Sequence, residues 1–400
     1  MIRIKENKIL VYIFFQIFVL SANESVVGSL IPVIASELNI GLDFIGSAIS
    51  LSIFGIFLVS LTAGNLIELF GLKKMIFTGT ILGFFGSFGL FLSNTFTIFI
   101  IAYFLLHLGI GVILICILSI VGNYYSGNKA SSLIKIKLGR IGALIISPLL
   151  VSLILFLKLD WRYFFIITLV FQLALIIILL VFKIPRKIEV GRNFKTLFVV
   201  NKKIISNFYF ILCSIIVFLF APIADTFFTW FTSYFLSLNI SIKVSSLFLS
   251  SFGLSIFAGM LFKIKLVKIF QEKRILLFSF ILSFFLLIGI LLIDNLVLKN
   301  ILIFLFGFNI AGNFAITFSI SSELFSEYAN SISGLLIAFT YLGIMFFQYL
   351  SGYLSEHFSK DSVLYINIVT LFILVVITSI LNFTKISKHP AHNNNSRLSI

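Results

Sequence analysis

The chain has 400 residues, of which 60% are hydrophobic and only 11% are charged. A water-soluble protein of this length cannot bury so much apolar surface, so the composition excludes a soluble fold and indicates a membrane protein. The formal net charge of +15 invites a nucleic-acid partner. We expect none, because the basic residues gather in the tails and in alternate loops, which is a signal of membrane topology.

Apolar stretches of bilayer-spanning length recur along the whole chain, and lipid allows only helices at that length. The sequence predicts an all-α membrane protein with twelve transmembrane helices in two pseudo-symmetric six-helix halves. The predicted spans are 8–33, 43–63, 75–93, 96–120, 136–157, 161–183, 207–236, 244–264, 275–293, 299–320, 331–354 and 362–384.

A shift of 200 residues brings parts of the chain into register with each other. Leu38-Asn39-Ile40 recurs as Leu238-Asn239-Ile240, and the basic pair Lys73-Lys74 recurs as Lys273-Arg274. A duplicated membrane half explains this, and many transporters are built in that way. The predicted parts are an N-terminal half at 1–183, a cytoplasmic linker at 184–206, a C-terminal half at 207–384 and a cytoplasmic tail at 385–400.

The charge asymmetry predicts the orientation. With twelve spans, only Lys158, Arg162, Lys243, Lys299 and Lys360 fall on the side opposite the termini. Both termini are therefore expected in the cytoplasm of a bacterial cell whose inner membrane holds the protein, with basic loops against anionic lipid. The linker contains a stretch at 194–200 that is apolar enough to lie on the membrane as a short helix. We find no Gly-rich phosphate loop, so no nucleotide or other cofactor is expected.

Two acidic residues, Glu24 and Asp225, fall well inside predicted spans, in the first helix of each half. An ionisable group in the membrane is costly unless it faces a cavity or a partner, so both are candidates for proton or substrate binding. A structural acid bonded to a neighbouring helix is the alternative. Arg140 is expected to extend towards the cytoplasmic surface, and binding of an anionic group is the alternative.

Further candidates are amides and one imidazole. They are Asn23, His107, Asn309, Asn313 and Gln348. His107 can relay protons or simply be a buried neutral ring, and the amides can contact substrate or join helices to each other. The first, fourth, seventh and tenth spans carry the unusual polar groups, whereas the third, sixth, ninth and twelfth are almost wholly apolar. This pattern predicts that the first helix of each triplet lines a wet cavity.

Three segments resemble the major facilitator superfamily. Between the second and third spans, residues 64–74 resemble the family's signature loop, with Gly64, Gly71, Lys73 and Lys74 in place, Glu68 where the family has Asp, and Leu69 where it has Arg. The sequence Trp161-Arg162 opens the sixth span as in many members, and residues 23–38 resemble the first helix of the drug:proton antiporters and sugar-efflux permeases. The resemblance implies a cytoplasmic gate at the signature loop, in which Glu68 docks on the start of the eleventh helix.

The resemblance also implies a function. It is secondary active transport of a small organic solute by a monomer, most simply efflux in exchange for protons. Import of a nutrient or metabolite with protons, siderophore export, and a channel or non-transporting scaffold are the alternatives. Departures from the family pattern weaken the link to proton-driven export, because the helix-four Arg of many antiporters is Leu105 here.

Overall fold

The structure is a computed structural model that describes residues 2–124, 129–181, 204–324 and 329–383. All regular elements in these ranges are helices, and twelve spans among them are long and apolar enough to cross a membrane. The predicted all-α membrane fold is confirmed. The surface helix predicted at 194–200 and the tail at 385–400 lie outside the described residues, as does most of the linker predicted at 184–206.

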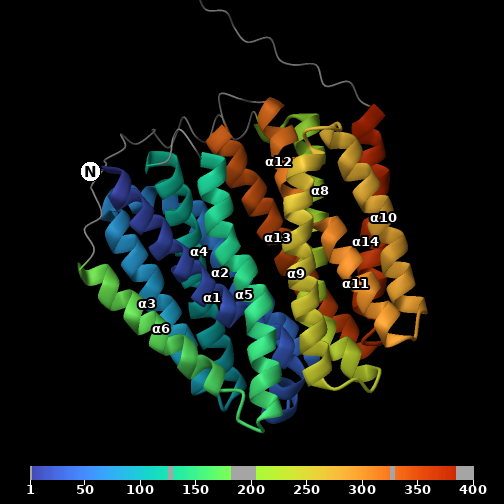
Figure 1. The fold of residues 1–400 in the computed structure, drawn as a ribbon, viewed down its shortest axis with the longest axis horizontal. Coiled ribbons are helices and arrows are strands. Elements are labelled where there is room, and N and C mark those ends of the chain that lie inside the picture. Colours follow the sequence, from blue (N-terminus) through green and yellow to red (C-terminus); the bar gives the residue numbers. More distant parts are fainter. Residues whose placement is uncertain (1, 125–128, 182–203, 325–328, 384–400) are drawn as a thin grey trace, which may run out of the picture.

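The first six helices form the N-terminal half, on the left of Figure 1. Their bounds are α1 (Ile2–Leu38), α2 (Leu42–Phe70), α3 (Leu72–Phe91), α4 (Phe96–Tyr124), α5 (Lys129–Phe156) and α6 (Tyr163–Val181). Most of them are apolar around their circumference, as expected for helices that contact lipid on one side and protein on the other.

The remaining helices form the C-terminal half, on the right of Figure 1. Their bounds are α8 (Phe208–Ser237), α9 (Ile242–Leu266), α10 (Glu272–Leu292), α11 (Leu296–Ile310), α12 (Asn313–Leu324), α13 (Ala329–His357) and α14 (Ser362–Phe383). Each half has a large hydrophobic core of its own, and the core of the N-terminal half also takes in Trp230 and Ile344 from the other half.

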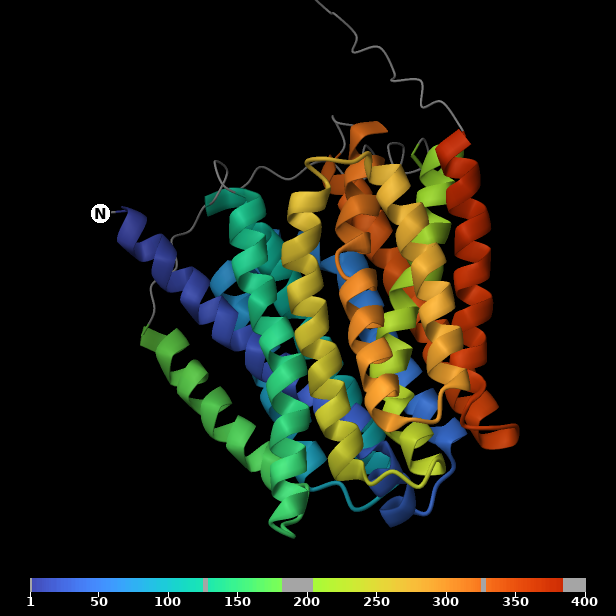
Figure 2. The same cartoon turned by 45° about the vertical axis from the view of Figure 1, so that its right-hand side comes forward.

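The start of α1 and the end of α14 lie at the same end of the bundle, at the top of Figures 1 and 2. We call this the terminal end and the opposite one the far end. Connections at the far end are short: three residues (39–41) separate α1 from α2, and four (238–241) separate α8 from α9. Asn39 and Asn239 both have positive φ, 50° and 62°, so the two turns repeat each other across the halves.

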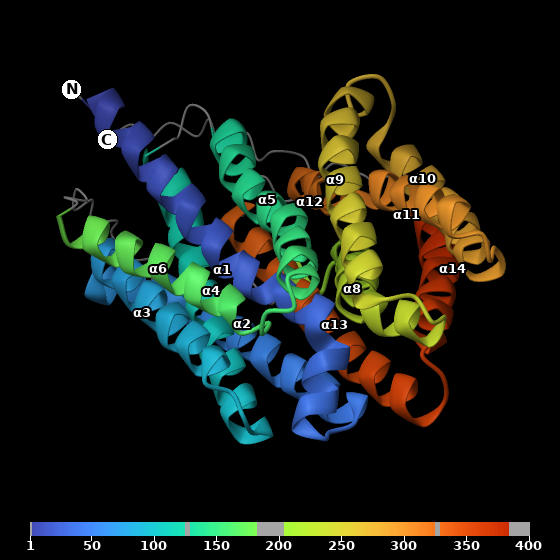
Figure 3. The same ribbon diagram turned by 60° about the horizontal axis from the view of Figure 1, so that its bottom comes forward.

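The halves meet where α2 packs beside α13, α5 beside α9 and α1 against α8, and Figure 3 shows the first two pairs side by side. Glycines allow the close approach. A Cβ atom on Gly46 would lie 2.9 Å from the Cα of Gly352, and one on Gly28 would lie 2.9 Å from the carbonyl oxygen of Phe228. Any larger residue at Gly28 or Gly46 would push the halves apart.

The tenth span differs from its prediction. Instead of one helix, it consists of α11 and α12, separated by Ala311 and Gly312. Gly312 has φ +76°, a left-handed conformation that glycine adopts at little cost. The break lies between Asn309 and Asn313, yet the amides of both residues donate to Ser279 of α10.

Candidate functional site

A cavity lies between the two halves, and side chains of α1, α2, α4, α5, α8 and α13 line it. Its empty volume, including space open to solvent, is about 520 Å³. The first, fourth and seventh spans contribute as predicted, whereas no described residue of the tenth span does. The polar lining consists of Glu24, Ser25, Tyr103, His107, Arg140, Asp225, Thr229, Tyr341 and Gln348.

Arg140 turns into this cavity, so the expectation that it extends towards the cytoplasmic surface was wrong. Its Nη2 donates to Oε1 of Glu24 over 3.2 Å. The side chains are 28% and 21% exposed, respectively, so the pair can be reached by water or solute from the cavity. A charged hydrogen bond across the α1–α5 contact satisfies both groups in a place where neither would be stable alone.

His107 lies beside this pair on α4. Its Nδ1 is 3.0 Å from the carbonyl oxygen of Tyr103, and its Nε2 is 3.9 Å from Oε1 of Glu24. Because a carbonyl only accepts hydrogen bonds, Nδ1 carries the proton, and Nε2 of the neutral ring is a free acceptor facing Glu24. The imidazole therefore faces the Glu24 carboxylate without a direct hydrogen bond to it.

Asp225 enters the cavity from α8, in the other half. Within the described part of the chain it has no hydrogen bond or ion pair, but its charge interacts with those of Arg140 and Glu24. One guanidinium thus serves two carboxylates that belong to different halves. With all three groups charged and His107 neutral, the site has one negative charge in excess, which a proton or a cationic group can balance.

Gln348 of α13 lines the cavity with its amide already engaged. Trp230 Nε1 donates to its Oε1 over 2.8 Å, and its Nε2 donates to Thr229 Oγ1 over 3.0 Å. These bonds fix the amide between α8 and α13. A solute in the cavity would meet a held polar surface here rather than a mobile side chain.

The other predicted amides lie away from the cavity. Asn23 bonds to Ser87 (2.9 Å) and Thr168 (2.7 Å), which joins α1 to α3 and α6. Asn309 and Asn313 lie inside the C-terminal half, where they contact Lys263 and Ser279. All three amides therefore join helices to each other, which is the alternative to substrate contact given in the sequence analysis.

The described residues of the signature loop do not line the cavity. Gly71 ends α2 and starts α3 with φ +82°, and Lys73 Nζ donates to the carbonyl oxygen of Leu180 over 3.2 Å, which ties α3 to α6. Lys74 is exposed. The side chain of Glu68 and the surroundings of Gly64 lie outside the described residues, so the docking of Glu68 on the eleventh span stays a prediction.

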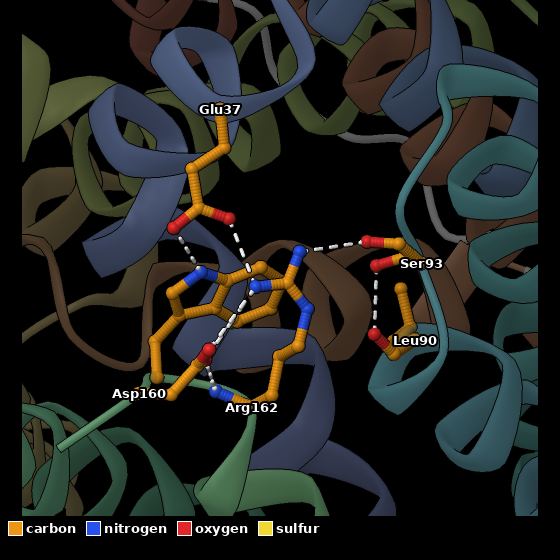
Figure 4. Close-up of polar contacts among 6 residues, drawn as sticks. Glu37, Leu90, Ser93, Asp160 and Arg162 are labelled. Carbon is orange, nitrogen blue, oxygen red and sulfur yellow. Dashed lines mark hydrogen bonds and ion pairs between the residues drawn. The ribbon is translucent and has the colours of Figure 1, made fainter.

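The Trp-Arg sequence at the start of α6 forms a clip at the far end of the N-terminal half (Figure 4). Glu37 accepts from Trp161 Nε1 over 3.1 Å and from Arg162 Nη1 over 2.9 Å. Arg162 Nη2 also donates to the carbonyl oxygen of Ser93 over 2.9 Å, and Asp160 accepts from the Arg162 backbone. The clip joins the end of α1, the α3–α4 connection and the start of α6, and it does not reach the cavity.

Sequence reasoning missed Arg140, Tyr103 and Tyr341 as cavity residues. Counting residues from the far end of each helix would have indicated Arg140. Arg140 precedes the end of α5 by nearly as many residues as Glu24 precedes the end of α1. Both residues therefore lie about 21–24 Å from the far end along their helices. No comparable signal marks the two tyrosines, because aromatic residues are common along every span.

Comparison with known proteins gives a family and a fold. Residues 13–347 match a family model described as Major Facilitator Superfamily. No curated protein sequence matches the chain. Among solved structures, the nucleoside transporter NupG superposes with a TM-score of 0.76 at 14% identity, over 95% of this chain and 100% of its own.

Two further structures agree with this fold. A D-xylose-proton symporter has a TM-score of 0.75 at 14% identity and covers 92% of this chain and 96% of its own. The inward-open xylose transporter XylE from E. coli has a TM-score of 0.72 at 12% identity, over 96% and 98%. At such low identity, these similarities show the arrangement of helices. The chemistry of the cavity has to be inferred from the residues of this chain.

Proposed function

Because the chain belongs to the Major Facilitator Superfamily, we propose that its central cavity couples the movement of a small organic solute to that of protons through Glu24 and Asp225. The protein is an integral membrane transporter that works by alternating access, and it is not an enzyme. Its partners are a small-molecule substrate and, in this proposal, protons. We expect it to act as a monomer in a bacterial inner membrane with both termini in the cytoplasm.

The single observation that carries the coupling proposal is the position of Arg140. It is bonded to Glu24 of its own half and interacts electrostatically with Asp225 of the other half. Protonation of Glu24 removes the charge that holds the guanidinium, which is then drawn towards Asp225. A proton can thus change an interaction between the halves, which is what coupling to alternating access requires.

The cavity lining indicates the chemistry of the solute. Two phenols, a hydroxyl of Thr229 and the amide of Gln348 surround the charged groups, while Ile49, Ile53 and Phe228 supply apolar walls. Hydroxyl and amide groups among aromatic rings suit a polar organic molecule of modest size. A drug, sugar or other metabolite of that kind is the proposed class of substrate.

Export is the direction we propose, since the first helix resembles those of drug and sugar exporters. Proton-coupled import is the second candidate, because one of the structures with the same fold is described as a proton symporter. Both directions use the same cavity. They differ only in whether solute and proton cross together or in exchange.

Proteoliposomes with an internal pH-sensitive dye test substrate, coupling and direction in one assay. A panel of drugs, sugars and nucleosides is added, and a solute that is exchanged for protons changes the internal pH in the opposite sense to a symported one. For the responding solute, we expect Glu24→Gln to abolish accumulation driven by a pH gradient and to retain solute exchange, which needs no net proton movement.

Asp294→Asn is the matched control, because it makes the same charge change at an exposed far-end position outside the cavity. It should transport like the unmodified protein, while Asp225→Asn should impair solute affinity more than coupling. Normal pH-driven accumulation by Glu24→Gln would show that Glu24 is not the coupling group. No saturable uptake or exchange of any solute would favour the channel or scaffold alternative.

A further inference from the structure

A buried lysine lies in the C-terminal half, away from the cavity. Lys263 is only 6% exposed, near the end of α9. Its Nζ donates to Ser279 Oγ over 3.1 Å, to the carbonyl oxygen of Asn309 over 2.6 Å, and to Oδ1 of Asn313. The acceptors come from α10, α11 and α12, so a single amino group joins four helices of this half.

The acceptors match the donors in number. A charged lysine has three N–H donors and no acceptor, and each finds one oxygen. In the described part of the chain no carboxylate lies within ion-pair distance of Lys263, so only neutral oxygens accept from its amino group. This is how proteins hold a bound monovalent cation inside a membrane, with carbonyl, hydroxyl and amide oxygens around it.

The oxygens lie at the break in the tenth span. Asn309 belongs to the last turn of α11, whose carbonyls lack the donors that a continuous helix would supply. The same carbonyl oxygen also accepts from Ser279 Oγ over 2.8 Å. A positive charge at the C-terminal end of α11 interacts favourably with the helix dipole. The amino group of Lys263 thus supplies a donor to a carbonyl oxygen at the break.

The segment beyond the break contacts the other half. Phe314, in the first turn of α12, lies under Lys137 of α5 with 5.5 Å between the ring centroid and Nζ. Holding α12 in place therefore also holds a contact between the halves. A group that stabilises or releases the break can affect how the halves close at the terminal end.

We propose that Ser279, Asn309 and Asn313 form a binding site for a small primary ammonium cation, which the side chain of Lys263 occupies as a tethered ligand. The site stabilises the break between α11 and α12 and takes the place of a bound metal cation there. If the lysine side chain is shortened, the vacated oxygens can bind a free ammonium or methylammonium ion instead.

The experiment is thermal unfolding of the detergent-purified full chain, which requires no known substrate. Lys263→Ala should lower the midpoint temperature by several degrees, since it removes one donor from each of three oxygens and leaves Oδ1 of Asn313 without a donor in the described part of the chain. Methylammonium chloride should restore at least half of that loss. Tetramethylammonium chloride, which has the same charge and no N–H donor, should restore none of it at the same ionic strength, and the unmodified protein should respond equally to both salts.

Two further variants complete the test. Lys263→Met keeps the alkyl stem and packing without the ammonium, so it should lose stability and gain nothing from methylammonium. Lys265→Ala removes an exposed lysine two residues away and should behave like the unmodified protein. An unchanged midpoint for Lys263→Met would overturn the proposal, because the charge would then be dispensable. Equal rescue of Lys263→Ala by both salts would overturn it too, because the response would then be one to ionic strength.

Discussion

At the scale of single residues, Arg140 matters most for the charge of the site. It is the one cation among the described groups that line the cavity. It balances Glu24 directly and Asp225 at longer range. Its bond to Glu24 spans α1 and α5, so its charge bears on stability as well as on transport.

At this scale we predict the effect of Arg140→Gln. The change leaves two carboxylates facing each other without a counter-charge, and we expect a loss of about 1–3 kcal/mol in stability and at least about a tenfold loss of transport. The double variant Glu24→Gln/Arg140→Gln removes one of the two unpaired charges, leaving that of Asp225, and should recover part of the stability. Thermal unfolding of the four proteins as a double-mutant cycle measures the coupling.

Arg274→Gln is the control for Arg140→Gln, because Arg274 is exposed at the start of α10 and does not line the central cavity. It should leave the unfolding midpoint unchanged. Additive losses for Glu24→Gln and Arg140→Gln would mean that the two side chains do not stabilise each other, against the 3.2 Å contact.

At the scale of single elements, the broken tenth span stands apart from the other spans of the described chain. Gly312 permits the break through its φ of +76°, and a Cβ atom there would make only ordinary contacts, 3.4 Å from Lys263 Cδ at the closest. The cost of any other residue at this position is therefore backbone strain rather than a clash.

We predict that Gly312→Ala lowers stability by about 1–2 kcal/mol, the cost of a left-handed conformation for a residue with a Cβ atom. Gly334→Ala is the matched control. Gly334 lies in the helix α13 with open space around it, so alanine should be neutral or slightly stabilising there. Thermal unfolding compares the two, and an equal midpoint for both variants would contradict a role of backbone conformation at 312.

At the scale of the whole molecule, the two halves are latched together at the far end. The carboxylate of Glu356, on α13, accepts from the backbone N–H of Leu42 over 2.8 Å. Leu42 is the first residue of α2, where Gly41 supplies no side-chain cap. A carboxylate of one half thus caps a helix of the other, just beyond the close contact of Gly46 with Gly352.

We predict that Glu356→Ala shifts the protein towards states that are open at the far end. The cap is partly buried and contributes about 1 kcal/mol, so the ratio of open to closed states should rise about fivefold. Spin labels at Asn94 and Asp294, one in each half, would report this as a larger long-distance population. Asp361→Asn changes a charge at the same end without touching α2 and should leave the distances as they are.

An unchanged distance distribution for Glu356→Ala would mean that the glycine contacts alone keep the far end closed. The latch is independent of the signature loop, which the sequence places at the other end. The far-end latch and a gate at Glu68 would therefore act in opposite directions on the same equilibrium.

The sequence by itself determined the class of protein, the twelve spans and the family. Lipid satisfies no backbone group, so each span must close its own hydrogen bonds and appears as an apolar stretch of fixed length. The same rule makes Glu24 and Asp225 conspicuous, because acids within such stretches are rare. These inferences depend only on residues close together in the chain.

Only the tertiary structure decided which polar side chains share a space. Asn23 and Glu24 are adjacent in sequence, yet one lies between α1, α3 and α6 and the other faces the cavity, because neighbours on a helix point about 100° apart. Arg140 turns inwards because Glu24 of another helix is there, and the tenth span breaks where Lys263 of α9 supplies a cation. Such partners are more than forty residues apart in the chain, so only packing brings them together.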